Sequence, residues 1–328
     1  MAEAAATTRG LPAGAEGTVV TVGTFDGVHV GHRDLLHRLA ARAAQRRTAS
    51  VLVTFEPHPL EIVNPVLAPP LLTPGIEKLA AVADTGVHHA VVLPFTRALA
   101  ALPAAAFVEQ ILLERLAMRE LLIGYDHGLG RGREGDAAAL RALGQRHGFT
   151  VQVVDAVQVD GEPVSSTRVR RALAAGDLSA AARLLGRRFA FDGTVVAGEG
   201  RGRALGYPTL NVQLRDARKL LPPGGVYAVL AETPRGSFGG MMNLGPRPTF
   251  GEETTTLEVH LFDVGGDWYG LAVRVQFVAR LRDTVKFASA DALVAQLARD
   301  AEHARFALTQ LVARDTVKGS SSIPTSFL

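Results

Sequence analysis

The sequence predicts an α/β domain, followed by a small antiparallel β-barrel domain with a C-terminal helix. Three observations predict this arrangement. Up to about residue 186, short apolar segments alternate with helical ones, which is typical of a parallel sheet covered on both faces. Beyond that point the apolar segments follow one another, separated by glycine and proline turns, which is typical of an antiparallel barrel. An amphipathic segment over residues 291–312 then closes the folded part.

Composition narrows the class of protein. The 328 residues are enough for two domains, and 47 % hydrophobic with 20 % charged residues is ordinary for a soluble globular chain. The absence of cysteine excludes disulfides, thiolate nucleophiles and cysteine–zinc sites. A net charge of +3 from scattered residues does not indicate a nucleic-acid partner, although it suits anionic nucleotides.

The distribution of apolar and charged residues also sets the expected localisation and the expected limits of the domains. No apolar run reaches membrane-spanning length and the first residues lack the features of a signal peptide, so we expect a cytoplasmic protein without a membrane partner. Homo-oligomerisation is left open. The expected divisions are a tail over 1–16, a first domain over 17–186, a second domain over 187–315 and a tail over 316–328.

In the first domain, each expected strand is a short apolar run and each expected helix lies between two such runs. A proline-rich stretch at 64–70 is a candidate flexible flap, and Thr73 is the expected N-cap of the helix after it. The expected strands cover 18–22, 50–55, 90–93, 121–124 and 150–154, and the helices cover 34–44, 74–82, 103–117, 136–146, 166–174 and 178–185.

The stretch 22–32 is predicted to be a strand-to-helix turn and the centre of the first domain. Its glycines allow a tight turn and leave room for a ligand. The following helix N-terminus suits phosphate. His29 and His32 are spaced to share one helix face, with Gly31 leaving a flat gap between them. These features suit the triphosphate and adenine of ATP, although paired histidines can also be surface residues or metal ligands.

Further loops leave the carboxyl ends of the expected strands, where parallel sheets bind ligands. The loop 124–133 has four glycines and two arginines, so it is either a phosphate and ribose cradle or a solvated loop. The hydroxyl groups of residues 165–167 open a helix and are either caps or phosphate contacts. Arg168 in that first turn opposes the helix dipole, and a bound anion would offset this.

In the second domain, two stretches carry polar groups suited to chemistry. Residues 200–211 form a glycine-rich loop ending in Thr209 and Asn211, whose neutral oxygens suit Mg²⁺ bridged to phosphates, unless the stretch is only a polar turn. In residues 256–263, Glu258 and His260 share the strand face opposite three apolar residues. That polar face is either solvated exterior or part of a site inside or at the mouth of the barrel.

These motifs and their order along the chain resemble those of the bacterial bifunctional riboflavin kinase/FMN adenylyltransferase (FAD synthetase) family. The resemblance rests on Gly-Thr-Phe-Asp-Gly-Val-His with His-x-Gly-His, on a Ser-Ser-Thr-x-x-Arg pattern, on Gly-Tyr-Pro-Thr-Leu-Asn and on the stretch 256–263, and it covers residues 18–312. His127 and Leu129 stand where the family has aromatic residues, and Leu210 stands where it has alanine.

The resemblance implies a Rossmann-like nucleotidyltransferase domain that makes FAD from FMN and ATP, and a barrel that makes FMN from riboflavin and ATP, with Mg²⁺. It implies Glu258 as the base that activates the riboflavin hydroxyl, His29, His32 and Arg168 as the catalytic residues of the first domain, and Thr209 and Asn211 as the metal site. The implied substrate- and nucleotide-binding residues are Gly23, Thr24, Phe25, Asp26, Gly31, His58, Asn64, Gly124, Asp126, Ser165, Ser166, Thr167, Gly202, Gly206, Pro208 and Asn243.

Two other functions compete with this one. A nucleotidyltransferase with another substrate and an accessory barrel would have no need of Glu258 or of the Thr209 and Asn211 pair. A non-catalytic flavin- or RNA-binding protein is the second alternative. RNA binders have clustered basic residues interleaved with exposed aromatics, whereas aromatic residues here are only 6 % and the basic residues are scattered.

Overall fold

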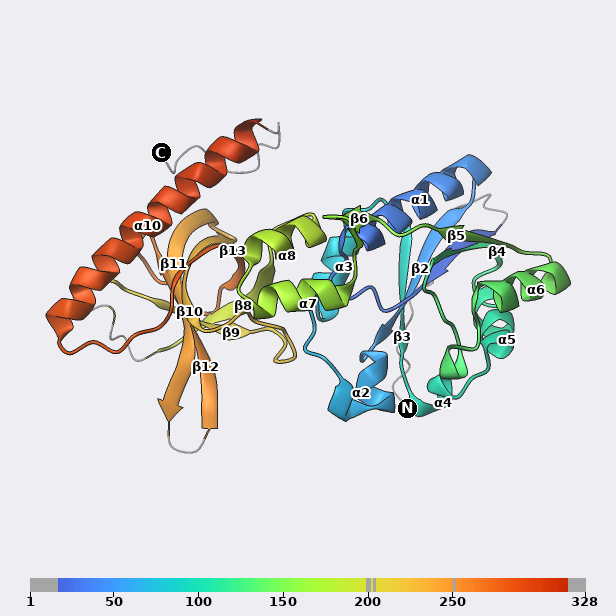
Figure 1. Ribbon diagram of the computed structural model, residues 1–328, viewed down its shortest axis with the longest axis horizontal. Coiled ribbons are helices and arrows are strands. Elements are labelled where there is room, and N and C mark those ends of the chain that lie inside the picture. Colours follow the sequence, from blue (N-terminus) through green and yellow to red (C-terminus); the bar gives the residue numbers. More distant parts are fainter. Residues whose placement is uncertain (1–16, 199–201, 203–204, 250–251, 318–328) are drawn as a thin grey trace. The chain divides into compact units, whose positions relative to one another are not determined.

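The structure is a computed structural model, and it describes residues 17–198, 202, 205–249 and 252–317 (Figure 1). Its internal contacts divide the chain into two compact units, one ending at Ser166 and one beginning at Thr167.

The first unit is built on a five-stranded sheet in the order β3-β2-β1-β4-β5, with every neighbouring pair parallel. All five strands expected from the sequence are confirmed. The strand order reverses between β1 and β4, and ligands bind at such a reversal in open parallel sheets. The strands are β1 (Thr18–Val22), β2 (Ala49–Glu56), β3 (His89–Pro94), β4 (Met118–Gly124) and β5 (Thr150–Val154).

Helices cover both faces of this sheet, as the alternating sequence pattern predicts (Figure 1). On one face, α1 (Val30–Arg46) and α3 (Gly75–Ala83) pack through Leu36, Leu39 and Ala81 onto β1, β2 and β4. The other face is covered by α5 (Ala104–Phe107), the π-helical η2 (Val108–Leu113) and α6 (Ala137–His147). Successive residues of a strand point to opposite faces of the sheet. Val19 therefore packs in the core under α1 and α3, and Val20 packs in the core under α5, η2 and α6.

Three local predictions in this unit are wrong. The helix expected over 103–117 is broken into α5, a π-helical segment and a turn, because the hydrogen bonds shift register at Val108. The proline-rich stretch 64–70 is not a loop throughout, since the 3₁₀ helix η1 (Pro65–Leu67) lies in it, directly after the short helix α2 (Pro59–Val63). Pro74, not Thr73, is the N-cap of α3, because the Thr73 hydroxyl accepts from the Gly27 N–H at 2.7 Å.

Short elements complete the first unit. They are α4 (Arg97–Ala100), the 3₁₀ helix η3 (Arg131–Arg133) and the two strands of a hairpin, β6 (Gln158–Val159) and β7 (Glu162–Pro163).

The second unit contains a closed barrel in the order β10-β11-β12-β9-β8-β13, which confirms the predicted antiparallel barrel. The sequence did not predict β9, because its first two residues belong to the stretch 200–211 that was expected to be a polar loop. The strands are β8 (Ala190–Val196), β9 (Leu210–Leu214), β10 (Gly225–Thr233), β11 (Gly236–Thr249), β12 (Glu252–Leu261) and β13 (Ala272–Arg282).

The predicted closing helix is present as α10 (Ala290–Val317). It packs on β10, β11 and β13, with Ala304 and Leu308 buried against Ala228 and Met241. Asp300, 1 % exposed, receives the guanidinium of Arg282 at 2.6 Å and so ties the helix to β13.

The two units divide earlier than the expected boundary at residue 186. Helices α7 (Ser166–Ala174, whose first residue closes the first unit) and α8 (Leu178–Leu185) group with the barrel, and α8 packs against β13. The expected boundary at residue 186 marks the change from alternating helices and strands to strands alone. The observed division marks which elements pack together. The boundary at 186 therefore stays a prediction.

Candidate active sites

The histidine pair lies directly after β1, at the carboxyl edge of the sheet. His29 is the N-cap of α1 rather than part of it, and its Nδ1 accepts from the His32 N–H at 3.2 Å. The two rings are stacked, with centroids 3.6 Å apart and planes 12° apart. Because Nδ1 of His29 is an acceptor, a neutral His29 carries its proton on Nε2. The pair therefore lies together, as predicted, but by stacking rather than by helical spacing.

The turn leading to these histidines is strained. Phe25 and Val28 have φ of 50° and 39°, in the left-handed region that side chains other than glycine avoid. The Phe25 ring lies 4.9 Å from the His32 ring. A Cβ at Gly23 would approach the Phe25 ring to 2.9 Å, so glycine lets Phe25 fold back. Glycine at position 23 and the positive φ at Phe25 together bring the Phe25 ring against His32.

Asp26 and Ser166 fasten this turn to the rest of the unit. The Asp26 carboxylate accepts the N–H groups of Leu72 at 3.0 Å and Thr73 at 2.9 Å. The Ser166 hydroxyl donates to the Asp26 carbonyl at 2.8 Å, so residues 140 positions apart meet at the turn. The sequence assigned both residues to nucleotide contacts. Their observed hydrogen bonds hold the turn itself.

Both the side chain and the backbone N–H of His58 form hydrogen bonds within the protein. Its Nδ1 accepts from the Leu60 N–H at 3.2 Å, and Glu61 accepts its backbone N–H at 2.8 Å, which makes a capping box for α2. Asn64, at the other end of α2, is exposed. Both residues follow β2 and so lie after a carboxyl end of the sheet.

The glycine-rich loop after β4 contains a half-buried histidine with a lowered pKa. Burial and, to a smaller extent, the nearby Arg133 lower the pKa of His127 to about 4, although Asp126 acts in the opposite direction. Its Nε2 is buried and makes no hydrogen bond within the described residues. Arg133 donates to the Asp126 carbonyl at 2.5 Å and shapes the loop. Leu129 is 5 % exposed and joins the apolar core.

In the barrel, three predicted site residues form one row across adjacent strands. Glu258 of β12 pairs in register with Asn211 of β9 on one side and with Asn243 of β11 on the other. Directly opposed residues project from the same face of a sheet, with Cβ atoms about 5 Å apart. Strand register therefore brings together a carboxylate and two amides from widely separated positions in the sequence.

This row lies on the outer face of the barrel wall. Leu257, Val259 and Leu261 are buried on the inner face, while Glu258 and His260 are half-buried on the outer one. Met241, the partner of His260 across the strands, packs under α10 outside the barrel. The polar site is thus neither inside the barrel nor fully solvated.

The loop before β9 is held tightly beside this row. The Nδ1 of His260 is 2.8 Å from the Pro208 carbonyl oxygen, and the Tyr207 N–H donates to the Gly202 carbonyl at 2.8 Å. Gly206 has φ of 82°, which favours glycine. Two glycines also allow close approach, since a Cβ at Gly198 would lie 1.8 Å from the Asn211 amide nitrogen. At Gly202 such a Cβ would lie 2.2 Å from the Tyr207 carbonyl oxygen.

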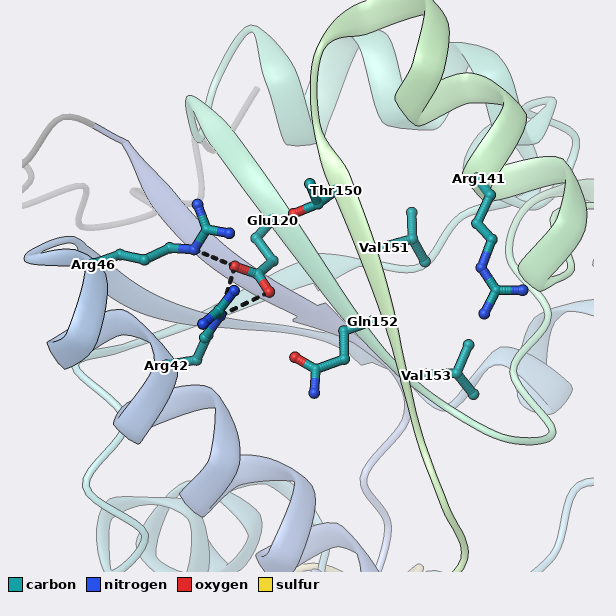
Figure 2. Close-up of a pocket in the computed structure, with 8 residues that line it drawn as sticks. All are labelled: Arg42, Arg46, Glu120, Arg141, Thr150, Val151, Gln152 and Val153. Carbon is teal, nitrogen blue, oxygen red and sulfur yellow. Dashed lines mark hydrogen bonds and ion pairs between the residues drawn. The ribbon is translucent and has the colours of Figure 1, made fainter.

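A surface pocket of ≈ 520 Å³ lies elsewhere, at the edge strand β5 and toward the amino ends of β4 and β5 (Figure 2). Arg42 and Arg46 from the end of α1 approach the buried Glu120 at 3.0 and 2.5 Å, while Arg141 lies on the other side of β5. Glu120 therefore clamps α1 to the sheet, and this pocket is separate from the carboxyl edge that carries the histidines.

Two basic residues were missed by the sequence reasoning. In the Ser-Ser-Thr-x-x-Arg pattern the arginine stands three positions after Thr167, which is Arg170 rather than Arg168. Thr167, Arg168 and Arg170 all lie on α7, from Thr167 onward in the second unit. Lys78 on α3 is buried at the carboxyl ends of β1 and β2. No sequence signal distinguished it from a surface lysine.

Comparison with known proteins bears on both units. The FAD synthetase family model matches residues 11–168, and the riboflavin kinase family model matches residues 185–308. A bifunctional riboflavin kinase/FMN adenylyltransferase from Escherichia coli K12 is 42 % identical over 301 residues, covering 90 % of this chain and 95 % of the relative. One from Pseudomonas fluorescens is 43 % identical over 291 residues, covering 88 % and 92 %.

The chain belongs to the bifunctional riboflavin kinase/FMN adenylyltransferase family. A solved structure described as a macrolide-efflux protein from Streptococcus pneumoniae has a TM-score of 0.79 and 32 % identity, covering 87 % of this chain and 92 % of that one. Among the described residues, no helix combines the length and the apolar character needed to cross a membrane.

Proposed function

We propose that the barrel phosphorylates riboflavin to FMN, and that the parallel-sheet unit transfers AMP from ATP to FMN, giving FAD and pyrophosphate. The observation that carries the proposal is the pairing of two different sites in one chain of this family. One site has a stacked histidine pair at a helix N-terminus, and the other has a row of one carboxylate and two amides on a barrel wall.

The two reactions need different groups. A riboflavin hydroxyl must lose a proton before it attacks phosphorus, so the kinase site needs a base, and Glu258 is the carboxylate in the row. Its cross-strand neighbours Asn211 and Asn243 flank it with neutral polar groups.

The FMN phosphate, by contrast, is already a nucleophile at neutral pH. The adenylyltransferase site need only align it with the α-phosphate of ATP and stabilise the developing charge. The Nε2–H of His29 is suited to donate a hydrogen bond to such an oxygen, and the stacked His32 lies beside it. We place the ATP phosphates at the start of α1 for this reason.

Thr209 and Asn211, at the start of β9 beside the barrel row, fit a hard divalent cation. Their neutral oxygens are ligands that Mg²⁺ would take when it also binds substrate phosphates. Within the part of the chain that is described, no group of three or more histidine, aspartate or glutamate side chains could hold a metal alone. Mg²⁺ bound with ATP would neutralise phosphate charge, while Glu258 would remain the proton acceptor.

A single incubation tests the proposal. The protein is mixed with riboflavin, ATP and Mg²⁺, and the flavins are separated by chromatography over time. We expect FMN to appear first and FAD after it, with one pyrophosphate released for each FAD. FMN without FAD would leave only the kinase assignment standing, and binding without conversion would favour a non-catalytic flavin protein.

A further inference from the structure

A buried cation lies where β1 and β2 end, and the two reactions proposed above do not account for it. Lys78, in the first half of α3, is only 6 % exposed. Its ammonium donates to the carbonyl oxygen of Phe55 at 3.0 Å and to that of Thr24 at 3.4 Å. Burying an ammonium costs free energy, and an apolar side chain would fill this space without that cost. The lysine therefore does something at this point that an apolar residue cannot do.

The two carbonyls mark the place where β1 and β2 separate. The Gly23 N–H still donates across to the Val53 carbonyl at 3.0 Å. One residue later the β1 chain turns away, and the carbonyl of Thr24 receives side-chain donors instead. These are the ammonium of Lys78 and the hydroxyl of Thr54, the latter at 3.1 Å. A buried carbonyl needs such partners, and together they fix how far the two strand ends stand apart.

The position of the Thr24 carbonyl is transmitted to the histidines. The peptide group between Thr24 and Phe25 is planar, so holding its oxygen sets the orientation of the whole group. Phe25 has the strained φ of 50°, which persists only when its surroundings hold it. Its ring lies 4.9 Å from that of His32, which stacks on His29. A continuous chain of contacts thus leads from the ammonium to the candidate catalytic pair.

We infer that Lys78 is a positioning residue for adenylyl transfer: it holds the Thr24–Phe25 peptide and, through the Phe25 ring, the stacked histidines. The inference rests on the proposed adenylyltransferase activity of this unit. It concerns a residue that touches backbone oxygens rather than the reacting phosphates.

The first test is Lys78→Met, which keeps a long unbranched side chain and removes the ammonium. We expect kcat for FAD formation from FMN to fall by about 10- to 100-fold, because small misplacements of reacting groups cost that much. The KM values for FMN and ATP should change by less than about threefold, since the residues proposed to bind both substrates remain. Riboflavin phosphorylation should be unchanged. The matched control is Lys286→Met, the same change at an exposed lysine.

The second test is Thr54→Val, which is nearly isosteric and removes the other side-chain donor to the Thr24 carbonyl. One neutral hydrogen bond is typically worth a few-fold in a rate, so we expect kcat to fall by about three- to tenfold with KM unchanged. If Lys78→Met does not fold, this variant decides the question.

Wild-type kcat in both variants would overturn the inference, even if their melting temperatures fell, because Lys78 would then be only structural. A raised KM with unchanged kcat would overturn it as well. If the wild-type protein itself forms no FAD, the proposed function fails, and the inference fails with it.

Discussion

The two candidate sites are built in opposite ways. In the parallel-sheet unit the groups belong to turns beyond the strands, and hydrogen bonds between distant segments hold them, as when Ser166 reaches the Asp26 carbonyl. In the barrel the groups belong largely to the strands themselves, and the register of β11, β12 and β9 aligns Asn243, Glu258 and Asn211. The strained turn keeps its shape because hydrogen bonds from other segments hold it, whereas the row in the barrel is fixed by strand register.

This difference predicts how each site responds to amino-acid substitutions. Changes at a distance should disturb the histidine turn, because its geometry depends on side-chain fasteners. The barrel row should respond mainly to loss of its own side chains. The following experiments test this contrast, beginning with the largest expected effect.

Changing both His29 and His32 to Ala should abolish FAD formation while FMN still accumulates. Loss of one donor to a developing charge typically costs ~10²–10³ in rate, so loss of the stacked pair should exceed ~10³. Flavin chromatography after incubation with riboflavin and ATP measures both products. His37→Ala is the control, because His37 is exposed on the same helix. Normal FAD formation by the double variant would make the pair structural.

Glu258→Gln should lower riboflavin phosphorylation by ~10²–10⁴, because it keeps the size of the side chain and removes the proton acceptor. FAD formation should survive when FMN is supplied, since that chemistry belongs to the other unit. Parallel assays with riboflavin or FMN as substrate separate the two effects. Glu302→Gln, at an exposed position of α10, is the control. Near-normal FMN formation would require a different base.

Two fragments test where the barrel unit begins. Residues 187–328 follow the sequence boundary, and residues 167–328 follow the observed contacts. Both should make FMN and no FAD. The longer fragment should melt higher by several degrees, because α8 buries Leu184 and Leu185 in this unit and a kcal/mol shifts the midpoint by ~2–4 °C at this size. FAD from either fragment would contradict the division of labour.

His127 predicts a smaller, pH-dependent effect confined to the first unit. Its pKa of about 4 lies below its ordinary value near 6.5, so between these pH values the unfolded chain binds more protons than the folded one. Stability of this unit should therefore fall as pH drops from about 6.5 to about 4, with a slope of at most about 1.4 kcal/mol per pH unit from this residue.

His127→Phe should flatten that slope. Hydrogen exchange of the β4 amides across the pH range reports on this unit alone, because β4 is an inner strand of its sheet, between β1 and β5. His303→Phe, at an exposed position of the other unit, is the control. An equal slope in the His127 variant would assign the pH dependence to other groups.

The architecture was predictable because its signals are periodic. Five apolar runs separated by helices specify a covered parallel sheet, and Leu257, Val259 and Leu261 alternate with polar residues as the barrel wall requires. The histidine pair was also predictable, since a short motif at a strand end has a local geometry. In contrast, the helix over 103–117 failed because a shift to π-helical hydrogen bonding leaves the apolar pattern nearly unchanged.

Partnerships across the sequence could not be predicted. The sequence shows Asp26 and Ser166 as polar residues near a nucleotide motif, and only the fold shows that they bind the backbone and each other. The same holds for Lys78, whose burial depends on where α3 packs. The row in the barrel required the register of β9, a strand whose sequence resembles a loop. Side-chain type was therefore readable from the chain, whereas the partner of each side chain was not.

The edge strand β5 has a consequence for how molecules of this protein meet in concentrated solution. Within the described residues, β4 is the only strand that pairs with β5, so the other side of β5 is open to a further strand. Open edges invite stacking between identical molecules. Here Arg42, Arg46 and Arg141 surround the edge and Glu120 is the one acid among the pocket residues. Two copies meeting along this edge would bring six guanidinium groups together against two carboxylates. The mutual repulsion should discourage such growth, and added salt should weaken that protection.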